Sequence, residues 1–133
     1  MSKFVQILRA DQRGAAAVEF AMAAPIFLVL LFGVMQFGMM FQASNGLQQA
    51  VEVGARFATI YPRPTDAAIQ AKVLANTYGL DPDLITPPTI THGTSNGMPF
   101  VDISMTYDYT INLMLFQPPA IPLTHQRTAF QVP

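Results

Sequence analysis

The chain has 133 residues, with seven Lys or Arg against eight Asp or Glu and a net charge of −1. This length predicts a single domain, and the near-neutral charge gives no indication of a nucleic-acid partner. The sequence contains no cysteine, which excludes a disulfide framework and a thiolate metal site.

Near the N-terminus lies an apolar run, residues 20–41, in which Gln36 is the one strongly polar residue. As a helix, this run would extend about 33 Å, enough to cross a bilayer core about 30 Å thick. Pro25 and Gly33 lie within it, and both are tolerated in membrane helices. We therefore expect a transmembrane helix.

Positive charges are distributed unevenly around this run. Lys3, Arg9 and Arg13 precede it, and no Lys or Arg follows until Arg56. The positive-inside rule then predicts that the N-terminus is cytoplasmic and that most of the chain lies on the other side of the membrane.

Three interpretations compete for this N-terminal region. A secretory signal peptide is excluded because its apolar region is shorter, about 7–15 residues. A plain signal anchor explains everything except Glu19, since a carboxylate at the start of a membrane span is costly. The third interpretation is a type IV prepilin-like signal, in which a basic leader ends at Gly14 and Ala15 begins a mature helix. Glu19 is then its fifth residue, followed by Phe20.

The motif Arg13-Gly14-Ala15-Ala16-Ala17-Val18-Glu19-Phe20-Ala21, followed by Ala24-Pro25 and Gly38, carries a family resemblance. It resembles the TadE-like family of pilus assembly proteins, which are pseudopilins of the bacterial tight-adherence, or Flp pilus, secretion system. The resemblance implies a minor pilin or pseudopilin that helps assemble the pilus.

The resemblance also implies a processing site and partners. Gly14 and Ala15 would flank the bond cut by a prepilin peptidase, and Glu19 and Phe20 would act in assembly and registration. The other expected partners are pilins or pseudopilins, the Tad inner-membrane assembly platform and membrane lipid. The expected location is the bacterial inner membrane, as a single-pass protein with a periplasmic C-terminal domain. Entry into the filament and priming of its assembly both stay open.

Three regions are expected: a leader at 1–14, a transmembrane and extended helix at 15–60, and a periplasmic domain at 61–133. Beyond the apolar run, small or apolar residues recur with the period of a helix. These are Leu47, Ala50, Val51, Gly54, Ala55 and Ala58. We expect the domain's own sheet to cover this stripe, the alternative being a neighbouring subunit's helix. Glu52 and Arg56 are spaced for an i,i+4 ion pair.

A second helix is predicted over residues 66–78. Thr65 is the expected N-cap, and Gly79 is the expected residue just beyond the helix C-terminus. Asp81 is expected to cap a short turn that starts at Pro82, an interpretation preferred over a calcium site.

The C-terminal third alternates with the period of a strand. Its apolar positions are Val101, Ile103, Met105, Tyr107 and Tyr109. A strand at 89–92 is expected before it, joined by a turn-rich segment at 92–97, and an edge or bulged strand is expected at 123–132. Residues 111–116 are expected to be buried beneath the sheet, the alternative being an exposed contact patch. The predicted fold class is α+β, with a long transmembrane helix, a short helix and an antiparallel sheet of three or four strands.

Candidates for chemistry are few. His92 and His125 are the only histidines, and both are interpreted as surface residues without a metal. Asp102 and Asp108 lie on the wet face of one strand, where a flat sheet offers no cleft for acid and base catalysis. We therefore expect no enzyme activity, no cofactor and no small-molecule substrate. The alternative function is a single-pass anchor that presents an extracytoplasmic binding domain, and processing at Gly14 would discriminate the two.

Overall fold

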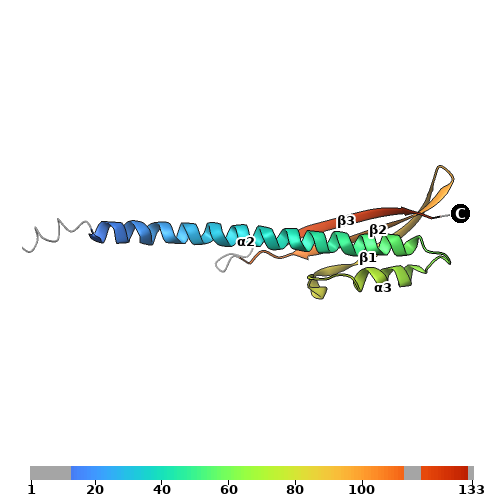
Figure 1. Cartoon of the computed structure of the whole chain (residues 1–133), viewed down its shortest axis with the longest axis horizontal. Coiled ribbons are helices and arrows are strands. Elements are labelled where there is room, and N and C mark those ends of the chain that lie inside the picture. The colour runs from blue at the N-terminus through green and yellow to red at the C-terminus, as the bar shows by residue number, and fades with distance from the viewer. Residues whose placement is uncertain (1–12, 113–117, 132–133) are drawn as a thin grey trace, which may run out of the picture. The chain divides into compact units, whose positions relative to one another are not determined.

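The computed structural model describes residues 13–112 and 118–131. Its elements are the helices α2 (Arg13–Ala58) and α3 (Asp66–Leu74), the 3-10 turn η1 (Pro82–Leu84) and three strands, shown in Figure 1. The strands are β1 (Ile85–Ser95), β2 (Met98–Tyr109) and β3 (Ile121–Phe130). The chain divides into two compact units, Met1–Gln36 and Phe37–Pro133. The α+β class, with one long helix, one short helix and a small antiparallel sheet, is confirmed.

Within the second unit, the last turns of α2 form part of a hydrophobic core. The buried α2 side chains are Ala43, Leu47, Ala50, Val51, Ala55 and Ala58. They cluster with Ile69 and Val73 of α3 and with residues of β2. The stripe of small residues is thus covered by the domain itself, as predicted from its period, because a helix buries one face when it lies against a sheet.

The sheet is antiparallel in the order β1-β2-β3. Asn96 (φ 52°) and Gly97 (φ 79°) form the two-residue turn between β1 and β2, and positive φ at both positions is what a tight hairpin turn requires. The expected strand at 89–92 and the expected turn at 92–97 were both wrong in extent. Because the tight turn fixes the register, Ser95 pairs with Met98 and β1 reaches the turn.

Strand β2 lies in the centre of the sheet and has the predicted alternation. Its five predicted apolar positions are all buried, at 0–8% exposed, while Asp102 and Asp108 lie on the other, wetter face. The core therefore occupies one face of the sheet. Strand β3 is an edge strand, as predicted, although it begins at Ile121, two residues earlier than expected.

Helix α3 is shorter than predicted. Thr65 is its N-cap, as expected, and the side chain accepts a hydrogen bond from the Ala68 amide. The helix ends at Leu74 instead of reaching residue 78. Two polar side chains end it by bonding its last carbonyls: the Asn76 amide donates to Lys72 O, and the Thr77 hydroxyl donates to Leu74 O.

The segment after α3 contains one wrong and one confirmed prediction. Gly79 has a positive φ of 76°, but it lies in a turn after the helix has ended, so it is not the residue that follows the helix. Asp81 caps η1 as predicted, because its side chain accepts from the Asp83 amide at 3.1 Å. Of the apolar segment 111–116, Ile111 packs against the core and residues 113–116 lie outside the described part of the chain.

Candidate functional site

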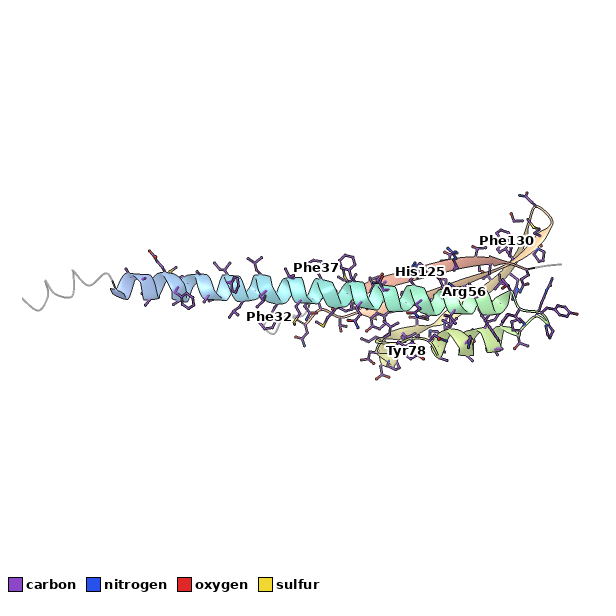
Figure 2. The ribbon with its side chains drawn as sticks, in the orientation of Figure 1. Phe32, Phe37, Arg56, Tyr78, His125 and Phe130 are labelled. Carbon is purple, nitrogen blue, oxygen red and sulfur yellow. The ribbon has the colours of Figure 1, made fainter. Side chains whose placement is uncertain are left out.

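The N-terminal unit presents an apolar helix surface without a protein covering. Within the described chain, one helix is long and apolar enough to cross a membrane; it covers residues 14–58 and contains an 18-residue window with a mean hydropathy of 2.3. Its large side chains are exposed: Phe20 is 74% and Ile26 is 66% accessible. Figure 2 shows Phe32 projecting from this ribbon. Since a long helix segment with apolar side chains exposed on all sides is typical of an apolar surrounding, this part of α2 is compatible with a single-pass anchor.

Glu19 is the one acidic residue of this surface, and its side chain is exposed. Among the residues that the structure describes, the Glu19 side chain makes no hydrogen bond or ion pair. Its neighbour Phe20 is also exposed. The two predicted assembly residues are therefore accessible to another molecule.

The expected processing site lies where α2 begins. The helix starts at Arg13, so Gly14 and Ala15 are in its first turn, and residues 1–12 of the expected leader lie outside the described part. First-turn amides lack partners within the helix, and glycine is the poorest helix former after proline. The bond between Gly14 and Ala15 is thus in a turn whose backbone amides are not held by the helix.

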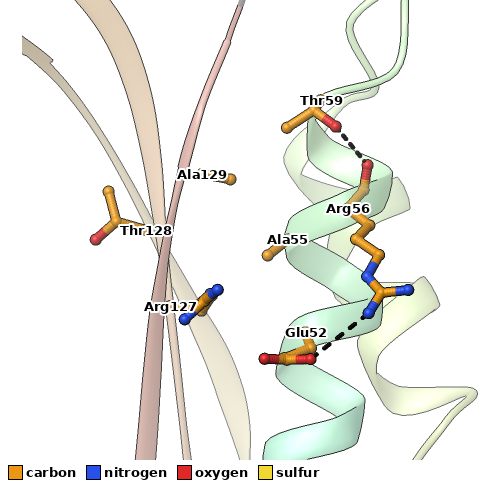
Figure 3. Close-up of a pocket in the computed structure, with 7 residues that line it drawn as sticks. All are labelled: Glu52, Ala55, Arg56, Thr59, Arg127, Thr128 and Ala129. Carbon is orange, nitrogen blue, oxygen red and sulfur yellow. Dashed lines mark hydrogen bonds and ion pairs between the residues drawn. The ribbon is translucent and has the colours of Figure 1, made fainter.

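The predicted Glu52–Arg56 pair is present, with the Arg56 guanidinium 3.7 Å from the Glu52 carboxylate. Both belong to a groove of about 320 Å³ between the end of α2 and strand β3, which we call the α2–β3 groove. Figure 3 shows Arg127 of β3 directed toward α2, with Ala55 and Ala129 facing each other above it. Sequence reasoning missed this groove, because it depends on which side of β3 meets the helix.

The histidines and aspartates singled out in the sequence make separate contacts and do not gather at one site. His92 contacts Asp66 at the start of α3, with Nε2 2.8 Å from the carboxylate. Asp102 accepts hydrogen bonds from Gln126 and Thr128 across the sheet. In the described residues, no group of three or more His, Asp or Glu side chains is placed to hold a metal ion.

Comparison with known proteins gives one match. A family model described as "TadE-like protein" matches residues 14–56. No curated protein and no solved structure matches the chain. The resemblance seen in the sequence is therefore confirmed over these residues.

Proposed function

We propose, from the TadE-like character of residues 14–56, that the chain is a minor pilin or pseudopilin that helps assemble a Tad pilus. The observation that carries this proposal is that the family match begins at Gly14, the expected last residue of a leader. The match then covers the exposed apolar helix. In this proposal the protein resides in the inner membrane with its N-terminus in the cytoplasm, and the sheet domain lies in the periplasm.

Processing would occur between Gly14 and Ala15. The bond lies in the first turn of α2, and a residue without a side chain suits a narrow peptidase site. We expect the mature protein to begin at Ala15 and Gly14→Arg to block its formation, whereas the small substitution Gly14→Ala retains most of it. N-terminal sequencing of protein from the native host tests this. A mature chain that starts at Met1 or near Ser44 would contradict it and favour a plain anchor or a signal peptide.

Glu19 would set the register between neighbouring subunits. Cleavage creates an α-amino group on Ala15, and such groups are mostly protonated at pH 7. Glu19 lies one helical turn away, so in a staggered bundle its carboxylate can pair with the amine of an adjacent subunit. An unpaired carboxylate at depth costs about 2–3 kcal/mol on insertion scales, and less near the interface. Misaligned subunits would carry that cost, which makes Glu19 a device for alignment.

The test is crosslinking from a photoreactive residue at Met22, one turn beyond Glu19 and 71% exposed. We expect Glu19→Gln to be inserted and largely cleaved, yet to lose most crosslinks to other pilins. Asp83→Asn is the control, since it also removes one exposed carboxylate but lies outside the apolar run and outside the α2–β3 groove. Undiminished crosslinking in Glu19→Gln would refute the registration role. Loss of cleavage alone would instead make Glu19 a determinant for the peptidase.

A further inference from the structure

Strand β3 carries charged and polar residues where its neighbour is apolar. Arg127 pairs with Ile103, and His125 pairs with Met105. Directly opposed residues of antiparallel strands share one face of the sheet. Ile103 and Met105 are 0% and 1% exposed, so Arg127 and His125 are on the core-facing side of an edge strand. An apolar residue at 127 would continue the core, and an arginine there needs a separate explanation.

The α2–β3 groove is open because its floor is made of small residues. Ala55 and Ala129 are 5% and 8% exposed and face each other between the helix and the strand (Figure 3). Arg127 closes one side from β3, whereas the Arg56 side chain lies on the side of α2 that faces away from β3, next to Glu52 (Figure 3). The Arg127 guanidinium therefore borders a slot whose alanine base cannot compete for its hydrogen bonds.

The charges of the groove are unbalanced. The Arg56–Glu52 contact of 3.7 Å joins an arginine side chain that is 83% exposed to a glutamate that is 33% exposed, and such surface pairs contribute little stability. Among the described residues, the Arg127 side chain makes no hydrogen bond or ion pair. Two cations and one anion leave a net charge of +1, which one carboxylate would neutralise. Guanidinium groups are suited to this ligand, because their fork of donors matches the two carboxylate oxygens.

We propose that the α2–β3 groove binds the carboxylate of an Asp or Glu in an extended segment of another protein. Ligand pockets range from about 300 to 1,000 Å³, so a groove of about 320 Å³ accommodates a side chain but not a helix. A segment that pairs with the free edge of β3 would direct alternate side chains to the face that carries Arg127. The carboxylate site itself does not depend on the proposed function. Only the further step of identifying the partner as a pilus component rests on it.

A simpler explanation makes a different prediction. Charged residues that point inward on edge strands discourage association between sheet edges, and either sign of charge serves that purpose. A carboxylate site requires a positive charge at position 127 and an open slot beside it. Arg127→Glu keeps a charge but reverses its sign, and Ala129→Leu keeps every charge but fills the slot. The two explanations therefore separate experimentally.

The test uses the full chain in detergent micelles, with the arginine side chains labelled with ¹⁵N for NMR. The probes are two capped pentapeptides, Thr-Val-Asp-Val-Thr and the same peptide with Asn in place of Asp. We expect the Asp peptide to shift the Arg127 side-chain signals and the Asn peptide to bind roughly five- to ten-fold more weakly. Arg127→Gln, Arg127→Glu and Ala129→Leu should each abolish that preference.

Lys72→Gln removes one exposed positive charge from α3, outside the groove residues, and controls for net charge. Equal binding of the two peptides, or an Asp preference that survives in Arg127→Glu, would overturn the carboxylate site. So would an Asp preference lost equally in Lys72→Gln, because the effect would then follow from total charge. Since no pilus enters this experiment, its outcome is independent of whether the chain acts in pilus assembly.

Discussion

Gly54 of α2 lies directly against Val73 of α3, and replacing it tests how this core is packed. An added Cβ at Gly54 would lie 2.3 Å from Val73 Cγ2 and 3.7 Å from Ile103 Cδ1. Val73 is fully buried and is β-branched, so its methyl groups have little rotational freedom. Gly54→Ala therefore forces the two helices apart or displaces Val73.

Two opposing terms set the magnitude. Alanine in place of glycine inside a helix stabilises by about 1 kcal/mol. Overpacking a close-packed core typically costs about 1–3 kcal/mol, and the shortfall from ordinary contact at Val73 is large enough to incur that cost. The net expectation is a loss of about 1 kcal/mol in the free energy of unfolding. For a domain of this size, the midpoint of thermal unfolding then falls by about 4–8 °C.

The assay is thermal unfolding of the full chain in micelles, followed by the near-ultraviolet circular dichroism of its buried tyrosines, Tyr107 and Tyr109. Gly38→Ala is the matched control, because nothing lies within 4 Å of its added Cβ. In a double-mutant cycle, Gly54→Ala should cost less in a Val73→Ala background, where the clashing methyl group is absent. If Gly54→Ala raised the midpoint as much as Gly38→Ala, or showed no coupling to Val73, the packing argument would be wrong.

Two further predictions concern the domain. Burial raises the pKa of Tyr109 above its ordinary value of 10.0, and the nearby Tyr107 adds to the increase. Because the folded pKa exceeds the unfolded one, this tyrosine's contribution to stability is complete below pH 10 and declines as pH rises through the folded pKa. Tyr109→Phe should lessen the loss of stability at alkaline pH, measured by denaturant unfolding. The control Tyr61→Phe should not, because Tyr61 is 91% exposed. Asp81→Ala removes the cap of η1 and should cost about 0.5–1 kcal/mol in the same measurement, whereas Asp81→Asn, which keeps an acceptor oxygen, should cost less.

The predictable parts of the fold are the elements in which the spacing of apolar residues shows which side is buried. The stripe beyond residue 46 and the alternation along β2 each describe an element packed on one side only. Thr65 and Asp81 were predictable as caps, because their side chains bond amides two or three residues away. In each case the information lies within a few residues of the feature it specifies.

The wrong or missing predictions concern features that depend on residues distant in the sequence or on competing hydrogen bonds of nearby side chains. Helix α3 ends where the side chains of Asn76 and Thr77 bond helix carbonyls. The prediction placed the end at Gly79, because helix propensity does not include such side-chain hydrogen bonds. The α2–β3 groove depends on the register between β2 and β3, which brings Arg127 opposite Ile103. The irregular alternation of β3 was the only local sign of this groove. It predicted an edge strand but not which element lies beside that strand.

Glu19 and Arg127 of the α2–β3 groove are charged residues in different surroundings. This difference predicts which of them contributes more to subunit association. A carboxylate left unpaired among apolar side chains costs about 2–3 kcal/mol at depth, whereas exposed ion pairs typically contribute about 0–1 kcal/mol. Arg127 is exposed to solvent, so losing its partner costs little, while Glu19 sits on a helix surface suited to lipid. If both sites act in one assembly, Glu19→Gln should therefore reduce subunit association more than Arg127→Gln. The reverse order would show that Glu19 remains solvated, and the alignment argument would lose its physical basis.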